Sequence, residues 1–122
     1  MMEKRIFIFA LVTLAGIALA SATQAGDGYT LKNSQNIMHF VQLDEGKASD
    51  VETYRRAIED ICKPGVKCQV LFWAENAPST FPMSREQSGS KTAYWQYDKK
   101  TDSHKLYVDC ELFSDIEDAE CL

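Results

Sequence analysis

The fold is decided by residues 49–73, which read SDVETYRRAIEDICKPGVKCQVLFW. Four apolar residues in the first half recur at helical spacing among charged ones: Val51, Tyr54, Ile58 and Ile61. This pattern predicts an amphipathic helix over about 50–62. Ser49, followed three residues later by Glu52, predicts a capping box at its start. The proline and glycine of the following turn end the helix, since neither continues it readily.

The second half of this stretch, 68–73, is apolar and rich in β-forming residues with little alternation. Such a run predicts a strand covered on both faces, and therefore a central one. Residues 92–97 and 105–110 predict two more strands, joined as a hairpin by the polar stretch 98–103. The sequence therefore predicts an α+β fold: one amphipathic helix packed on a small, mainly antiparallel sheet and stapled by disulfides.

Two earlier segments leave their structure open. Residues 26–33 are short and polar and are interpreted as a linker or an edge segment. Residues 37–43 fit both the helical and the strand period, and a helix is preferred because Ser34 could cap it. Further along, Ser84 and Gln87 predict a second, weaker capping box with a helix of about two turns.

Residues 1–25 have the composition of a cleaved secretory signal peptide: a positive start, an apolar run over 6–20 and small residues after it. The apolar run is shorter than the ~20 residues that span a bilayer, so no stable membrane span is expected. Cleavage after Ala22 or Ala25 is predicted, which leaves a single small domain over 26–122. We therefore expect the protein in the periplasm or secreted.

The charge of the chain is acidic, with a formal net charge of −5. Six carboxylates and no basic residue lie between Asp109 and Glu120. The preferred interpretation is a solvated, partly frayed tail, and an electrostatic attraction for a cationic partner is the other. An acidic surface disfavours nucleic acid as a partner. No cofactor is predicted.

Four cysteines follow the predicted leader: Cys62, Cys68, Cys110 and Cys121. Three pairings are open. The preferred one joins Cys62 to Cys68 and Cys110 to Cys121, because it closes short loops. If strands 68–73 and 105–110 were neighbours, Cys68 would instead pair with Cys110. A zinc site of three cysteines with His104 is less favoured, since an oxidising compartment favours disulfides.

The sequence contains no coherent catalytic set. Neither His39 nor His104 has an acidic residue at a spacing that would orient its ring, and no serine lies in a nucleophile elbow. No catalytic residue and no metal ligand is therefore nominated. A small hydrolase or metal-dependent enzyme that uses one of these histidines is the competing class of function.

Two stiff loops are the candidate binding residues. Lys63, Pro64 and Gly65 form the turn between two cysteines, and Phe81 and Met83 lie in a loop with two prolines. A stiff loop loses little entropy on contact, so these five residues are predicted to bind a partner. The alternative for Phe81 and Met83 is that they fold back as a lid on the edge of the sheet. The leading hypothesis is a non-catalytic periplasmic or secreted protein that binds a protein or an envelope component, with its oligomeric state open.

One local resemblance bears on function. Residues 62–68, CKPGVKC, and residues 70–75, VLFWAE, resemble the cysteine-bracketed loop and apolar strand of the Ivy-type periplasmic lysozyme inhibitors. In that family the loop enters the lysozyme cleft, and a histidine after the Lys-Pro pair blocks it. Gly65 occupies that position here, and the bracket is one residue longer. The resemblance implies an alternative function, inhibition of a lysozyme-type enzyme through the Cys62–Cys68 loop. The whole chain is similar to small secreted proteins of Gram-negative bacteria, which supply no activity to carry over.

Overall fold

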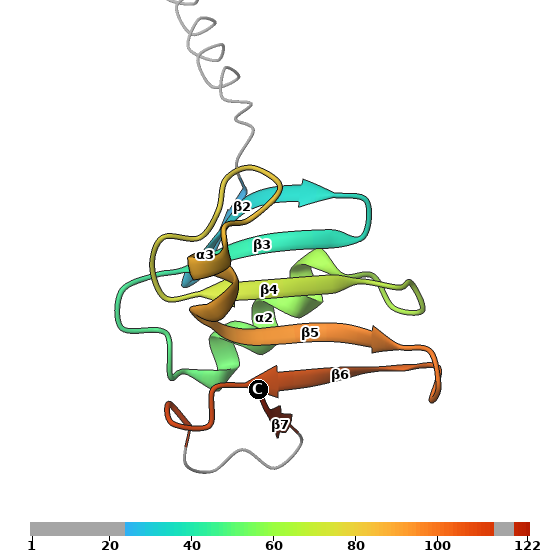
Figure 1. Cartoon of the computed structure of the whole chain (residues 1–122). Coiled ribbons are helices and arrows are strands. Elements are labelled where there is room, and N and C mark those ends of the chain that lie inside the picture. The colour runs from blue at the N-terminus through green and yellow to red at the C-terminus, as the bar shows by residue number, and fades with distance from the viewer. Residues whose placement is uncertain (1–23, 114–118) are drawn as a thin grey trace, which may run out of the picture.

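The computed structural model describes residues 24–113 and 119–122, which form a mixed sheet with helices on it (Figure 1). Most of the predicted leader, 1–25, lies outside the described residues. The strands follow one another across the sheet in chain order: β1 (Gln24–Gly26), β2 (Tyr29–Gln35), β3 (Met38–Leu43), β4 (Gln69–Trp73), β5 (Lys91–Asp98), β6 (Ser103–Val108) and β7 (Ala119–Cys121). The helices are α2 (Val51–Ile61) and the short α3 (Arg85–Gly89). None of the described helices is long and apolar enough to cross a membrane.

The pairing of the strands is mixed. β1–β2, β2–β3, β4–β5 and β5–β6 are antiparallel, whereas β3–β4 and β6–β7 are parallel. Parallel neighbours need a crossover, and α2 supplies it between β3 and β4. The α+β class is thus confirmed, while the centre of the sheet contains a parallel pair that the expectation of a mainly antiparallel sheet did not include.

The preferred helix over 37–43 is wrong, because this segment is β3. β3 is hydrogen-bonded to β2 on one side and β4 on the other, and Phe40, Val41 and Leu43 are buried on its two faces. Tertiary pairing decides an ambiguous period in such a case. Residues 26–33 also belong to the sheet, through β1 and β2, and are not a linker.

The predicted helix after Ser49 is present as α2, but its cap is Asp50. The Asp50 carboxylate accepts hydrogen bonds from the Glu52 backbone N–H at 3.2 Å and from the Thr53 hydroxyl at 2.9 Å. An N-cap carboxylate satisfies orphan amide donors as a serine would, so the capping box at Ser49 was the wrong choice between two adjacent candidates.

The second predicted capping box is confirmed. The Ser84 hydroxyl accepts from the Gln87 N–H at 3.0 Å, and the Gln87 side chain accepts from the Ser84 N–H at 2.9 Å. It begins α3, which is only five residues long. The Trp73 indole donates to the Gln87 carbonyl at 2.7 Å and so ties α3 to the end of β4.

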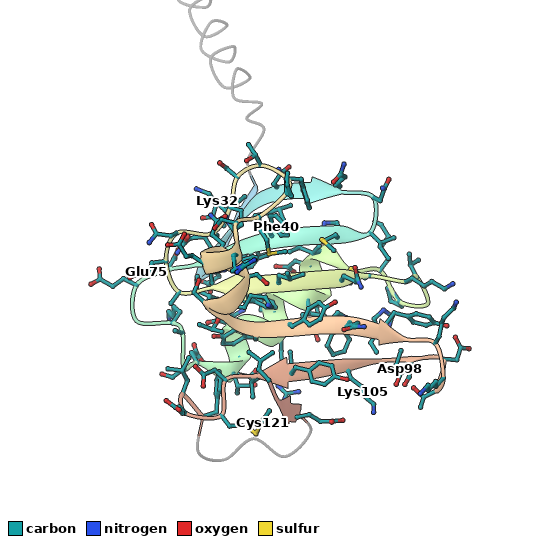
Figure 2. All side chains as sticks on the ribbon, in the orientation of Figure 1. Lys32, Phe40, Glu75, Asp98, Lys105 and Cys121 are labelled. Carbon is teal, nitrogen blue, oxygen red and sulfur yellow. A yellow bond between two sulfur atoms is a disulfide. The ribbon has the colours of Figure 1, made fainter. Side chains whose placement is uncertain are left out.

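The sheet carries a core on each face. On one face, α2 covers the strands, with Tyr54 and Ala57 packed on a cluster that includes Val70 and Phe72. The other face holds a smaller cluster of Phe40, Leu71, Trp73 and Ala77, and Figure 2 labels Phe40 within it. β4 contributes buried residues to both clusters. This confirms the prediction that 68–73 is a central strand.

The disulfides join Cys62 to Cys68 and Cys110 to Cys121, which is the preferred pairing. The alternative required β4 and β6 to be neighbours, and β5 lies between them. The second disulfide holds β7 beside β6, and Lys105 Nζ lies 3.3 Å from Glu120. Residues 119–122 are therefore ordered against the sheet and not frayed, whereas Asp115, Glu117 and Asp118 lie outside the described residues.

Candidate binding groove

A groove runs along the side of α2, between this helix, the loop 62–68 and the hairpin of β5 and β6. It consists of three adjoining pockets of about 260, 220 and 230 Å³. Trp95 lines the first and second, and His104 lines the first and third. We call this the groove, and the residues that define it are Arg55, Ile58, Glu59, Cys62, Lys63, Pro64, Gly65, Val66, Lys67, Trp95, Tyr97, Asp102, His104 and Leu106.

Trp95 forms the floor of the groove because of its place in the sheet. It lies on β5 opposite Val70 on one side and Leu106 on the other, and it packs at the margin of the core beneath α2. The helix covers Val70 but leaves Trp95 only partly buried. An aromatic ring at this boundary offers apolar contact area to a ligand.

The loop 62–68 forms one end of the groove and is closed by the first disulfide. Its residues 63–67 are all exposed, and the Val66 side chain is 52% exposed. The Val66 N–H donates to the Lys63 carbonyl at 3.2 Å, which makes a tight turn. Gly65 has φ +79° in this turn, a conformation that favours glycine. The loop is therefore small, exposed and conformationally restricted.

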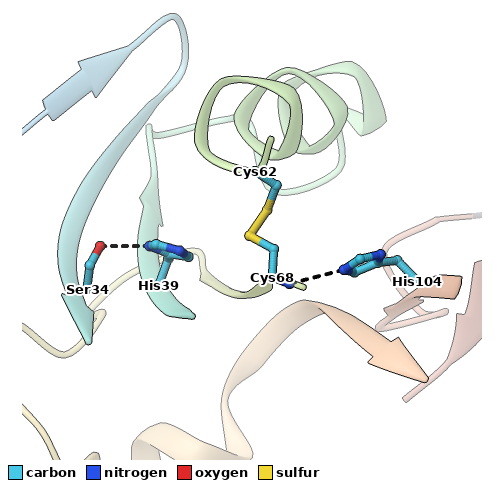
Figure 3. The surroundings of a disulfide bond; sticks show 5 residues. All are labelled: Ser34, His39, Cys62, Cys68 and His104. Atoms are coloured by element: carbon cyan, nitrogen blue, oxygen red, sulfur yellow. Dashed lines mark hydrogen bonds between the residues drawn. A yellow bond between two sulfur atoms is a disulfide. The ribbon is translucent and has the colours of Figure 1, made fainter. Parts of the chain in front are cut away.

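His104 connects the loop to the hairpin. Its Nε2 accepts a hydrogen bond from the Cys68 N–H at 3.1 Å (Figure 3). Its ring stacks on Trp95 with centroids 5.3 Å apart and an angle of 6° between planes. Because a backbone N–H can only donate, Nε2 is unprotonated and the neutral ring carries its hydrogen on Nδ1. His104 thus holds the start of β4 in place.

The other histidine lies outside the groove. His39 Nδ1 is 2.8 Å from the Ser34 hydroxyl across the β2–β3 pair, and burial lowers the pKa of His39 below its usual value (Figure 3). The contact has the atoms of a nucleophile and a base. A hydrolytic site also needs a group that orients the imidazole, and among residues 24–113 and 119–122 no carboxylate is hydrogen-bonded to either histidine.

A zinc site does not fit the cysteine pairing. Cys62 and Cys68 are bonded to each other, and Cys110 belongs to the other disulfide. A cysteine binds zinc as its thiolate, and a disulfide sulfur does not supply one. Within the described part of the chain, no group of three or more His, Cys, Asp or Glu side chains is placed to hold a metal ion.

The structure separates the two predicted binding loops. Lys63, Pro64 and Gly65 line the groove. Phe81 and Met83 lie on the opposite face of the sheet, where they pack against the smaller core cluster. This packing fits the lid that the sequence left open as an alternative, and neither residue lines the groove. Their role in binding stays a prediction.

Ile58, Trp95 and His104 are among the groove residues that the sequence did not nominate for binding. The alternation of Ala93, Trp95 and Tyr97 places these three residues on one face of a strand. It does not say which part of that face the helix leaves uncovered. The necessary information is the register between β5 and its neighbours, which comes from residues far apart in the chain.

Comparisons with known proteins do not extend this assignment. No protein-family model, no curated protein and no solved structure matches the chain. The function proposed below is therefore argued from the groove and its chemistry.

Proposed function

We propose that the protein is a non-catalytic binding protein of the periplasm or of the secreted compartment, which captures another protein or an envelope component in the groove. The observation that carries this proposal is Trp95, a partly buried indole in a concave surface beside a disulfide-closed loop. Partly exposed tryptophans in concave surfaces are typical of the residues that dominate binding energy. The two disulfides are typical of proteins in oxidising compartments.

The rigidity of the loop supports the same function. One disulfide closes it, and the Cys68 N–H is held by His104. Ordering a flexible loop costs about 0.5–1.5 kcal/mol for each side chain that is immobilised. A loop that is already held in place avoids much of this cost, so its exposed residues can contribute contact free energy to a complex.

The arrangement of the histidines favours binding over catalysis. His104 uses Nε2 to hold the backbone of Cys68, so that nitrogen is occupied by a structural contact. His39 contacts Ser34, without a carboxylate partner among the described residues. A general base needs a free nitrogen and an orienting group. Neither ring combines the two.

The proposal is tested by photo-crosslinking from the groove. A benzophenone amino acid is placed at Val66, and the matched control carries it at Leu112. Leu112 is 37% exposed and lies beyond the C-terminal end of β6, whereas His104 of the groove lies near the N-terminal end of that strand. In cells that export the chain, we expect crosslinked adducts of defined mass from position 66 and none from position 112. Adducts from position 112 alone, or from neither position, would contradict capture in the groove.

A second candidate function is inhibition of a lysozyme-type enzyme through the loop 62–68. It is supported by the exposure of Lys63 and Pro64 in a disulfide-closed turn. The glycine at position 65 supplies no imidazole to block a catalytic carboxylate. A cell-wall turbidity assay with purified lysozyme tests this candidate: stoichiometric inhibition that is lost in Lys63→Ala would support it, and full lysozyme activity at excess protein would reject it.

A further inference from the structure

The loop 62–68 at one end of the groove is basic, whereas the protein as a whole is acidic. Residues 62–68 contain Lys63 and Lys67 and no carboxylate, whereas the whole chain has a net charge of −5. Both lysine side chains are exposed, and Lys67 Nζ lies 5.0 Å from the centroid of the Tyr97 ring. The Tyr97 hydroxyl donates to the Asp102 carboxylate. This hydrogen bond holds the Asp102 carboxylate within the hairpin, where it lines the same pocket as Lys67 and keeps its negative charge.

His104 adds a hydrogen-bond donor to this end. Its Nε2 accepts from Cys68, so the hydrogen of the neutral ring is on Nδ1. His104 lines the two pockets that meet at Gly65 and Val66. The loop end therefore combines two ammonium groups with an imidazole N–H. This is a set of donors that suits carboxylate oxygens.

The other part of the groove is apolar. Ile58, the Cys62 side chain and Trp95 line the first pocket, and Leu106 extends the apolar wall in the second. Glu59 lines both the first and the second pocket, and Arg55 lines the second. The groove is thus lined by three cationic side chains and two carboxylates: Arg55, Lys63 and Lys67 against Glu59 and Asp102. The groove thus offers apolar contact and basic contact side by side.

The size of the pockets indicates what kind of ligand fits. The three volumes, about 220 to 260 Å³, are each below the roughly 300–1,000 Å³ of pockets that enclose a whole small molecule. Because the pockets adjoin in a row, they suit successive side chains of an extended chain. A large anionic surface, such as a lipid bilayer or nucleic acid, would meet the net negative charge of the whole protein.

We propose that the groove binds an extended acidic peptide segment of a partner protein, with an apolar side chain against Trp95 and carboxylates on Lys63 and Lys67. This inference rests on the proposed function and names the chemistry of the partner. The ammonium groups of Lys63 and Lys67 supply the positive charge that would attract the carboxylates of the peptide. Asp109 and Glu111 follow β6 at the opposite end of that strand from His104, and the loop 62–68 itself holds no carboxylate.

Labelled peptides provide the test. The probe is a short fluorescein-labelled peptide with Leu and Phe flanked by Asp and Glu, and two control peptides carry Asn and Gln or Lys at the acidic positions. Fluorescence anisotropy with the protein, cut after residue 22 and with its disulfides intact, is expected to show binding of the acidic peptide at least about ten-fold tighter than that of either control. Binding is expected to weaken between about 0.05 and 0.5 M salt, because exposed charges are screened.

Two double variants separate the loop lysines from bulk charge. Lys63→Gln with Lys67→Gln is expected to weaken binding of the acidic peptide about ten-fold or more. The matched control, Lys99→Gln with Lys100→Gln, removes the same charge from exposed positions that line none of the pockets of the groove. It is expected to change the affinity by less than about three-fold.

Intrinsic fluorescence reports the site directly. Trp73 is fully buried, so a change in tryptophan emission on adding unlabelled acidic peptide is assigned to Trp95. Trp95→Phe should abolish the change. The inference would be overturned if the two double variants lost the same affinity for the acidic peptide, or if the protein bound the basic peptide more tightly than the acidic one.

Vesicles of phosphatidylglycerol test whether the groove binds a membrane instead of a peptide. If the protein sediments with these vesicles and does not bind the acidic peptide, the inference is overturned. A contrary result in the peptide or vesicle experiments rejects only the acidic peptide as the ligand and does not reject the proposed binding function. Crosslinking from position 66 can succeed when the partner is not acidic.

Discussion

Replacing Phe81 with alanine distinguishes a lid from a binding tip. The ring of Phe81 stacks on that of Phe40 with centroids 4.3 Å apart, and it packs against the cluster of Phe40, Leu71 and Trp73. Phe81 is partly buried. Truncation of a fully buried phenylalanine costs about 3–5 kcal/mol, so a side chain that retains part of its exposure is expected to cost roughly half of this, about 2 kcal/mol.

The assay is a thermal melt followed by circular dichroism. For a domain of about 100 residues, 1 kcal/mol shifts Tm by about 4–8 °C, so Phe81→Ala is expected to lower Tm by about 10 °C. Val66→Ala is the control, because its side chain is 52% exposed and most surface changes stay within about 0.5 kcal/mol. An unchanged Tm in Phe81→Ala, with loss of partner capture, would refute the lid and restore Phe81 to the binding residues.

Three further predictions concern stability. Replacing Cys110 and Cys121 together with serine should destabilise the domain by roughly 3 kcal/mol, as measured by urea unfolding, because the disulfide constrains the unfolded chain; an unchanged midpoint would contradict this. Gly65→Ala should cost about 1 kcal/mol in the same assay, since φ is +79° and an added Cβ meets no atom within 4 Å. Burial lowers the pKa of His39 below its ordinary value of 6.5. Below pH 6.5 the unfolded chain therefore takes up the proton more readily than the folded chain, and stability falls as the pH decreases. His39→Gln should show a smaller loss of stability on acidification, and an identical pH profile for the two proteins would count against this role.

Local sequence was sufficient where short-range chemistry decides the structure. The helix at α2, the turn at Pro64 and Gly65, and the hairpin of β5 and β6 follow from periodicity and from proline and glycine. The pairing of Cys62 with Cys68 follows from the short loop between them. In each case the residues that decide the structure lie within a few positions of one another.

Tertiary structure decided what depends on partners far apart in the chain. Residues 37–43 become a strand only because β2 and β4 bond to both edges of it, and their local period alone fits a helix as well. Phe81 folds back because Phe40, from β3, offers a ring on which it stacks. The groove exists because β5 and β6 extend past the side of α2 and expose Trp95 next to His104. A sequence pattern specifies which face of a strand is apolar, but only the packed sheet specifies which part of that face is left uncovered.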